Sequence, residues 1–233
     1  MKAILLAGGY GTRLRPITNN IPKCLVEIAN KPLLQNWIEL LVNAGVNSIL
    51  INTHYLAEQV ENFVLNSRYS NIIKLSYEKE LLGTAGTVKN NLDFIGDDSI
   101  ILAHADNFTN CNLNQFLMAH KGKPSNTCMT MMLYNSERPK DSGIVKIDEN
   151  KIVIDFFEKS NNPPSNLANA AVYIIEAKVV KYIAKNDLSD FSTQVIPKFM
   201  GQINTWYNDC FHIDIGTPAA FALANEIANE KII

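Results

Sequence analysis

The chain has 233 residues, of which 47% are hydrophobic and 19% are charged, a balance that is typical of a globular protein and excludes a disordered one. Its 21 basic and 23 acidic side chains give a formal net charge of −2, which argues against nucleic-acid binding because that function needs a basic face. No apolar run approaches the ~18 residues of a membrane-spanning helix, so we expect no membrane partner.

The four cysteines are far apart and form no Cys-x-x-Cys pair, which excludes a zinc framework and a disulfide scaffold. The apolar stretch from Met1 to Ala7 leads directly into a glycine-rich segment without a cleavage site. We interpret it as a strand and not as a signal peptide. Reduced thiols and the lack of a targeting segment predict a cytoplasmic protein.

In the first half of the chain, strand and helix patterns alternate. The run from Lys2 to Ala7 is apolar throughout, as in a parallel strand covered on both faces. Pro32 opens a helix that ends before Gly45. This alternation predicts a doubly wound α/β sheet. The other elements expected here are strands over 48–53, 72–77 and 99–103 and helices over 56–65, 84–92 and 113–121.

From about residue 126 strands predominate. We expect a single domain, because the strand pattern continues on both sides of the one loop rich in turn residues, at 160–165. Its two halves, about 1–125 and about 126–233, differ in character. The expected strands are 128–134, 143–147, 152–157, 168–175, 203–207 and 211–215, and the expected helices are 177–185, 191–200 and 218–233.

A glycine-rich loop follows the first strand, at the kind of position where α/β proteins bind ligands. Its glycines would let backbone N–H groups approach an anion. It lacks the third glycine of a dinucleotide fingerprint, since Leu14 stands there, and it lacks the Gly-Lys-Ser/Thr of a Walker A loop. Arg13, Arg15 and Lys23 supply cations within or just after the loop, which favours a triphosphate as its ligand.

Six segments, in this order, resemble motifs of the sugar-1-phosphate nucleotidyltransferases (NDP-sugar pyrophosphorylases). The resemblance covers nearly the whole chain, and the loop at residue 80 is most similar to that of mannose-1-phosphate guanylyltransferases. The segments are Gly8-Gly-Tyr-Gly-Thr-Arg-Leu-Arg-Pro16 with Pro22-Lys23, Glu80-Leu-Leu-Gly-Thr-Ala-Gly86, Leu102-Ala-His-Ala-Asp106, Phe157-Glu-Lys159, Asn166-Leu-Ala-Asn-Ala-Ala-Val-Tyr173 and Asp214-Ile-Gly-Thr-Pro218.

The resemblance implies a Rossmann-like doubly wound mixed sheet of the glycosyltransferase-A-like nucleotidyltransferase type. Its nucleotide-binding half would be about 1–125 and its sugar-phosphate-binding half about 126–233. The chain ends soon after the Asp214 motif, so we expect no C-terminal β-helix of the kind that larger relatives carry. A homodimer is a further expectation.

The implied reaction joins a nucleoside triphosphate and a sugar 1-phosphate into an NDP-sugar and releases pyrophosphate. The attacking phosphate is already an anion, so the site needs positioning and charge neutralisation rather than a general base. By resemblance, Asp106 and Asp214 hold Mg²⁺, a cation that prefers oxygen ligands. The sequence departs from the family at His104-Ala105, where relatives usually have Asn-Gly.

The resemblance also assigns the remaining contacts. Arg13 would clamp the β- and γ-phosphates, and Lys23 would reach the α-phosphate and the sugar phosphate, although Cys24 replaces a frequent proline. Lys159 would pair with the sugar phosphate, beside Gly143, Glu158 and Asn169. The expected nucleotide-binding residues are Leu6, Ala7, Gly8, Gly9, Gly11, Thr12, Glu80, Gly83 and Thr84.

Several alternatives stay open. GTP is favoured over dTTP, with UTP and CTP behind, and the sugar cannot be read from the sequence. A phosphocholine cytidylyltransferase or a non-catalytic regulatory relative would use the same scaffold. Strand alternation puts His212 and Asp214 on one face of their strand, but His54, His104 and His212 receive no role.

Overall fold

The protein folds into two compact units in a computed structural model that describes residues 1–230. The first unit comprises Met1–Leu81, His104–Cys111 and the chain from Cys210 onward, and the second comprises Leu82–Ala103 and Asn112–Asp209. The chain passes between the units several times, so neither is one continuous stretch of sequence. The expectation of one domain with halves that meet near residue 125 stays a prediction.

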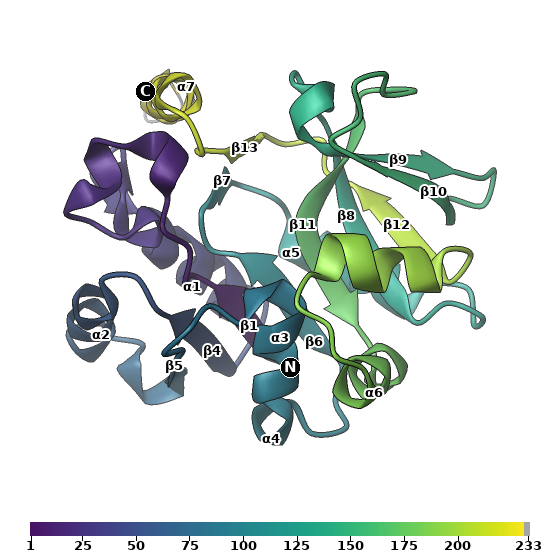
Figure 1. The fold of residues 1–233 in the computed structure, drawn as a ribbon, viewed down its shortest axis with the longest axis horizontal. Helices are drawn as coiled ribbons and strands as arrows, with labels where there is room; N and C mark the ends of the chain where they lie inside the picture. The colour runs from purple at the N-terminus through teal and green to yellow at the C-terminus, as the bar shows by residue number, and fades with distance from the viewer. Residues whose placement is uncertain (231–233) are drawn as a thin grey trace. The chain divides into compact units, whose positions relative to one another are not determined.

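The first unit is built on parallel strands covered by helices. Strands β1, β4 and β5 lie side by side in that order and are parallel throughout (Figure 1). Helix α2 packs on β5, and α1 contacts β3 and β7. The elements of this unit are β1 (Lys2–Leu6), β2 (Glu27–Ile28), β3 (Lys31–Pro32), α1 (Leu33–Asn43), β4 (Ser48–Thr53), α2 (Ala57–Leu65), β5 (Ile73–Tyr77), β7 (Asn107–Thr109), β13 (His212–Asp214) and α7 (Pro218–Glu230).

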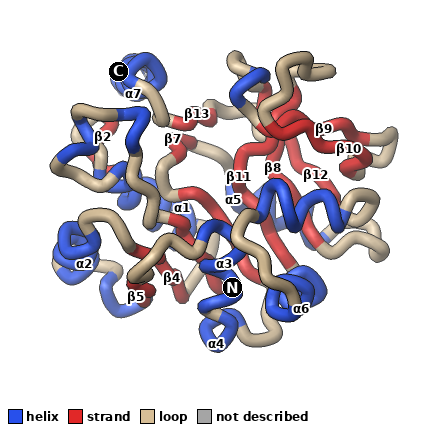
Figure 2. The backbone as a smooth tube through the Cα atoms, viewed as in Figure 1, coloured by secondary structure: helices blue, strands red, loops and turns tan. Residues whose placement is uncertain are grey.

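The second unit combines antiparallel and parallel pairing. Strand β11 is antiparallel to β6, β8 and β9, strand β12 is parallel to β8, and β9 and β10 form a hairpin. Strands β8 to β12 are among those drawn in red in Figure 2. Helix α5 packs on β8 and β12, and α6 packs on β11 and α3. Its elements are α3 (Gly83–Asn90), α4 (Leu92–Ile95), β6 (Ile100–His104), α5 (Leu113–Lys121), β8 (Met129–Asn135), β9 (Gly143–Ile147), β10 (Val153–Glu158), β11 (Leu167–Ile175), α6 (Ala177–Lys185) and β12 (Ile203–Tyr207).

These pairings confirm the predicted α/β class with a mixed sheet. The apolar runs predicted as strands are buried because parallel strands are covered on both faces, and Ala3, Ile4 and Leu5 in β1 are fully buried. No helix in the described part of the chain is both long and apolar enough to cross a lipid bilayer.

One predicted helix is helical but is not a regular α-helix. Of residues 191–200, Phe191–Val195 form a π-helix and Ile196–Phe199 a 3₁₀ turn. Pro197 lacks the N–H group that a continuing α-helix would need, which explains why the segment is not one α-helix. The last three residues of the helix predicted over 218–233 lie outside the described residues.

Candidate active site

The glycine-rich loop follows β1 and is held in place by its own backbone and by β4. The amide of Ala7 donates a hydrogen bond of 2.7 Å to Oδ1 of buried Asn52. Gly11 has φ +63°, and a Cβ atom there would lie 3.0 Å from Cγ2 of Thr18. Only glycine fits this position without strain.

A hydrophobic cluster anchors the segments that carry the polar side chains. Leu14 follows Arg13 in the sequence, and Ile215 follows Asp214. The side chains of Leu14 and Ile215 are fully buried and belong to one cluster with Phe108. The cluster also includes residues of β2, α1 and α7. It therefore fixes the backbone beside Arg13 and Asp214.

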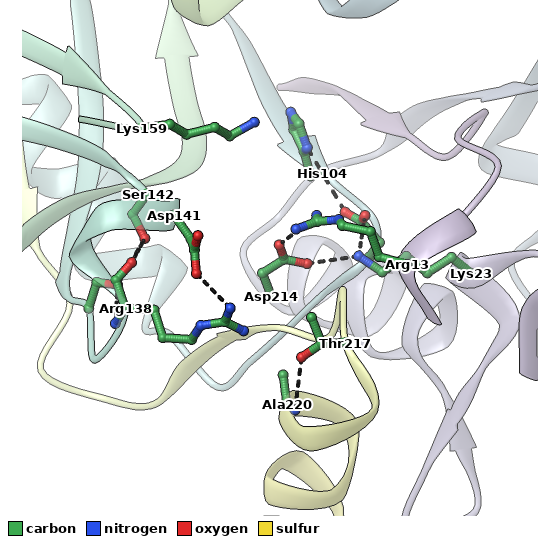
Figure 3. A network of polar contacts seen from close by, with 12 residues as sticks. Arg13, Lys23, His104, Arg138, Asp141, Ser142, Lys159, Asp214, Thr217 and Ala220 are labelled. Atoms are coloured by element: carbon green, nitrogen blue, oxygen red, sulfur yellow. Dashed lines mark hydrogen bonds and ion pairs between the residues drawn. The ribbon is translucent and has the colours of Figure 1, made fainter. Parts of the chain in front are cut away.

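Lys23 joins the two predicted metal ligands. Its Nζ atom donates hydrogen bonds of 2.7 Å to Oδ2 of Asp106 and to Oδ1 of Asp214, which come from distant parts of the sequence (Figure 3). The Lys23 side chain is only 9% exposed, whereas that of Asp214 is 49% exposed. The structure therefore brings three predicted site residues together around one ammonium group.

The charges of this cluster stabilise one another. Burial alone would lower the pKa of Lys23, but the two carboxylates outweigh it and raise the pKa above its ordinary value. Burial would raise the pKa of Asp106, but Lys23, with a smaller contribution from His104, lowers it below its ordinary value. Both groups are therefore charged at neutral pH.

Arg13 lies on the exposed side of the cluster. Its Nη2 atom is 3.5 Å from Oδ2 of Asp214, and its side chain is 65% exposed and available to an anion. A Cβ atom at Gly216 would lie 2.8 Å from Nη2 of Arg13 and 3.1 Å from both carboxylate oxygens of Asp214. Gly216 therefore makes room for this pair.

A cavity of about 160 Å³ opens between the glycine loop and this cluster. Its walls combine residues of the glycine loop with two cations and a carboxylate, which suits a phosphate group that binds backbone donors and charges together. It is lined by Leu6, Ala7, Gly9, Gly11, Thr12, Arg13, Lys23, Cys24, Asp106 and Gly216.

The donor set of the cluster fits a magnesium ion that is shared with a substrate. No group of three or more His, Cys, Asp and Glu side chains among residues 1–230 could hold a metal ion. Mg²⁺, however, is often bound by one or two carboxylates and completes its ligands with substrate phosphates and water. Asp106 and Asp214, which converge on one point, match that pattern.

In the second unit, Gly143 and Glu158 form a close pair. They are register partners of β9 and β10, and a Cβ atom at Gly143 would lie 2.8 Å from Oε2 of Glu158. Burial and the nearby charge of Asp190 raise the pKa of Glu158, against the lowering effect of Lys159. The Nζ atom of Lys159 lies 3.8 Å from Oε1 of Glu158, and its side chain is 67% exposed.

Asn169 lies on β11, where the register shifts between Asn169 and Tyr173. Its Nδ2 atom donates a hydrogen bond of 2.6 Å to the hydroxyl of Tyr173, and its Oδ1 accepts one of 3.0 Å from the amide of Ala171. Ala171 has φ +54°, an uncommon value for a residue with a side chain. These two bonds fix the Asn169 amide.

The predicted base-binding residues divide between the units. Glu80 is exposed in the first unit, in the turn after β5, where the side chain of its neighbour Leu81 approaches Gly8. Gly83 and Thr84 begin α3 in the second unit. Gly83 has φ +77°, and a Cβ atom there would lie 2.3 Å from the carbonyl oxygen of Ser189.

Sequence reasoning missed several residues around the glycine loop. Asn52 holds the loop through Ala7 and donates a 3.0 Å hydrogen bond to Oε1 of buried Glu78. His54, which received no role, contacts the Glu78 carbonyl at 2.8 Å and the Tyr10 hydroxyl at 2.9 Å. These residues lie on or after strands, and nothing in their spacing points to the loop.

The other two unassigned histidines also have structural neighbours. Nδ1 of His104 lies 3.9 Å from Oδ1 of Asp106, at the edge of the charged cluster. His212 is buried on β13, opposite Thr109 of β7.

Comparison with known proteins gives a family match over residues 2–231, to the model described as nucleotidyl transferase. Curated relatives include the mannose-1-phosphate guanylyltransferase catalytic subunit beta of Drosophila melanogaster, 33% identical over 94% of this chain and 60% of that protein. The mannose-1-phosphate guanyltransferase of Hypocrea jecorina is 33% identical over 95% of this chain and 62% of that protein. The UTP–glucose-1-phosphate uridylyltransferase of a Synechocystis strain is 29% identical over 100% of this chain and 66% of that protein.

The chain thus spans roughly three fifths of the length of the curated relatives it matches. Among solved structures, HddC from Yersinia pseudotuberculosis complexed with GMP-PN has a TM-score of 0.81 and is 26% identical, with 97% of this chain and 99% of that chain covered. A Bacillus anthracis protein described as a glucose-1-phosphate thymidylyltransferase has a TM-score of 0.85 and is 22% identical, with 99% of this chain and 96% of that chain covered. The fold is therefore the one predicted.

Proposed function

Since this chain belongs to the nucleotidyl transferase family, we propose that it transfers a nucleotidyl group from a nucleoside triphosphate to a sugar 1-phosphate and releases pyrophosphate. One observation carries the proposal: Lys23 is buried between Asp106 and Asp214 beside a cavity lined by the glycine loop and Arg13. A cation and two acidic groups around an anion-sized space suit a reaction between two polyanions.

In this reaction, a phosphate oxygen of the sugar 1-phosphate attacks the α-phosphorus, and the bond to the pyrophosphate oxygen breaks. The attacking oxygen is already ionised, so no side chain needs to remove a proton. Arg13, which is exposed beside Asp214, would neutralise the β- and γ-phosphates and the leaving pyrophosphate. Lys23 would stabilise charge on the α-phosphate from the position that its two carboxylate partners fix.

Asp106 and Asp214 would hold Mg²⁺, together with phosphate oxygens of the nucleotide. When bound, the ion supplies positive charge against the triphosphate. Lys23 would then share its carboxylate partners with the ion. The backbone of residues 6–12 would bind the triphosphate, because five residues of this segment line the cavity.

The sugar phosphate would bind to residues of the second unit. Lys159 is exposed and would pair with the phosphate, while Glu158 and Asn169 would accept and donate hydrogen bonds to sugar hydroxyls beside the Gly143 backbone. The fixed amide of Asn169 supports this assignment, because an oriented group loses little conformational entropy on binding.

GTP is the favoured nucleotide, and Glu80, Gly83 and Thr84 would contact its base. The relatives named mannose-1-phosphate guanylyltransferases and the HddC complex with GMP-PN support this choice. A uridylyltransferase is the second candidate, because the Synechocystis relative covers the whole chain at 29% identity. A cytoplasmic homodimer in nucleotide-sugar biosynthesis is the setting that we propose.

A substrate panel tests the proposal. Pyrophosphate release is measured for GTP, UTP, dTTP and CTP, each with hexose, hexosamine and heptose 1-phosphates and with phosphocholine, in Mg²⁺ and in EDTA. We expect the highest rate with GTP and a sugar 1-phosphate, and no release in EDTA. Release with UTP alone would support the second candidate. Release only with CTP and phosphocholine, or none at all, would contradict the proposal.

A further inference from the structure

Two hydrogen bonds join the N-terminus of α3 to a segment far along the second unit, Ser189–Phe191, which we call the strap. The amide of Ala85 donates a 2.9 Å hydrogen bond to the carbonyl oxygen of Ser189. The amide of Phe191 donates a 2.7 Å hydrogen bond to Oγ1 of Thr84. The first of these satisfies an amide that a helix start leaves without a partner inside the helix.

The strap is also fixed by the turn that follows it. Oδ1 of Asp190 accepts hydrogen bonds of 2.7 Å from both the amide and the hydroxyl of Thr193. Oε1 of Gln194 accepts hydrogen bonds of 2.8 Å from the amides of Ser189 and Asp190. These four hydrogen bonds fix the strap relative to the turn that follows it.

The far end of the strap packs on the residue that holds Asn169. The ring centroids of Phe191 and Tyr173 are 4.7 Å apart, and both side chains are buried. The Tyr173 hydroxyl accepts the 2.6 Å hydrogen bond from Nδ2 of Asn169 and also bonds the Ser192 side chain. Thr84 thus contacts Phe191, Phe191 contacts Tyr173, and Tyr173 in turn contacts Asn169.

The charge of the strap also acts on the other proposed sugar ligand, Glu158. Burial raises the pKa of Tyr173 well above its ordinary range, and the charges of Glu158 and Asp190 raise it further. Asp190 likewise contributes to the raised pKa of Glu158. The charge of Asp190 in the strap therefore acts on Glu158 and on Tyr173, the hydrogen-bond partner of Asn169.

We propose that the strap positions the sugar 1-phosphate site: Thr84 and Phe191 act through Tyr173 to hold Asn169 in place. The inference rests on the proposed function. It gives Thr84 a positioning role beside the base contact proposed above, because its hydroxyl oxygen accepts a hydrogen bond from the backbone amide of Phe191. It also couples the start of α3, where the nucleotide base is proposed to bind, to the place where the sugar is proposed to bind.

A double-mutant cycle tests this coupling, with the nucleotide and sugar 1-phosphate that react fastest in the panel. Thr84→Val removes the acceptor for the Phe191 amide, and Tyr173→Phe removes the acceptor for Asn169. Each should raise KM for the sugar 1-phosphate ~3- to 10-fold with a much smaller change in kcat, as expected for one lost hydrogen bond that positions a ligand. Both substitutions interrupt the same series of contacts. The KM of the double mutant for the sugar 1-phosphate should therefore be no higher than that of the more affected single mutant.

Thr127→Val is the matched control. Its hydroxyl donates a 2.7 Å hydrogen bond to the Pro124 carbonyl in the same unit, away from the strap, so KM for the sugar 1-phosphate should stay within twofold of wild type. An unchanged KM in Thr84→Val, or single effects that multiply in the double mutant, would overturn the inference while the proposed function stands. If no pair in the panel releases pyrophosphate, the proposed function fails and the inference fails with it.

Discussion

Lys23 shows how neighbouring residues make a buried charge acceptable. A lysine is rarely buried, and removal of its charge from water is costly unless partners replace the lost hydration. Asp106 and Asp214 do so, each at 2.7 Å from Nζ. The geometry leaves the ammonium group at the cavity wall, where it would meet the substrate.

Lys23→Met should lower kcat by roughly 10²- to 10³-fold, because it removes one fixed charge that would stabilise the reacting phosphate. Lys31→Met is the control, since that lysine pairs with Glu39 on the surface. Steady-state rates with saturating nucleotide and Mg²⁺ measure the effect, and circular dichroism checks the fold. A kcat within threefold of wild type would remove Lys23 from the mechanism.

Gly216→Ala should impair the site without unfolding the protein. The new methyl group would push on the flexible end of Arg13 and on Asp214, and we expect kcat/KM to fall roughly 10- to 100-fold through misplacement of these groups. At Gly122, after α5, a Cβ atom would lie 3.6 Å from its nearest neighbour, so Gly122→Ala should keep wild-type kinetics. Equal kinetics in both variants would contradict the role assigned to Gly216.

His120 should make stability depend on pH. Burial, together with the charge of Lys123, lowers its pKa to about 4, although Glu176 acts in the opposite direction. Between pH 6.5 and 4 the unfolded chain binds a proton that the folded protein excludes, so stability falls as pH falls. From pH 7 to pH 5 the wild-type free energy of unfolding should drop about 1–2 kcal/mol more than that of His120→Gln. Urea titrations that show parallel pH curves would contradict this.

At the same scale, the sequence indicated which acidic and basic residues to join but not how they meet. The motifs predicted Asp106, Asp214 and Lys23 as site residues. That Lys23 bridges the two carboxylates depends on side-chain packing around Leu14 and Ile215, which residue spacing does not encode. Asn52 gave no signal, because an asparagine inside an apolar strand has no distinctive pattern.

At the scale of elements, prediction succeeded where apolar residues kept the same spacing along the whole element. The predicted bounds of α5 and α6 match the structure, because their apolar residues recur at helical spacing over nine residues each. The helix predicted over 191–200 forms as a π-helix and a 3₁₀ turn instead of one α-helix, because Pro197 cannot continue the α-helical hydrogen-bond pattern. The short strands β2, β3 and β7 were missed because two or three residues carry no period.

The start of α3 should depend on Gly83 for stability. Gly83→Ala and Gly201→Ala both place a side chain at positive φ, near +77° and +78°, which costs ~1–2 kcal/mol. Only at Gly83 does the new Cβ atom also meet a backbone oxygen, that of Ser189. Gly83→Ala should therefore lower the free energy of unfolding by clearly more than Gly201→Ala. If urea titrations gave equal losses of unfolding free energy for the two variants, the contact with the strap would have relaxed, and this prediction would be wrong.

At the scale of the whole molecule, the division into two units was beyond sequence reasoning. The chain leaves the first unit after Leu81, returns for His104–Cys111 and returns again at Cys210. These crossings have no glycine- or proline-rich linkers to mark them. Asp106 and Asp214 reach Lys23 because both return segments belong to its unit, and that depends on long-range packing alone.

The central claim is that a sugar phosphate oxygen replaces pyrophosphate on the α-phosphorus of the nucleotide. The most direct test uses the preferred sugar 1-phosphate with ¹⁸O in its non-bridging phosphate oxygens, and mass spectrometry of both products. The account predicts that all the label stays in the NDP-sugar and that pyrophosphate carries none. Label in pyrophosphate, or no NDP-sugar at all, would contradict it.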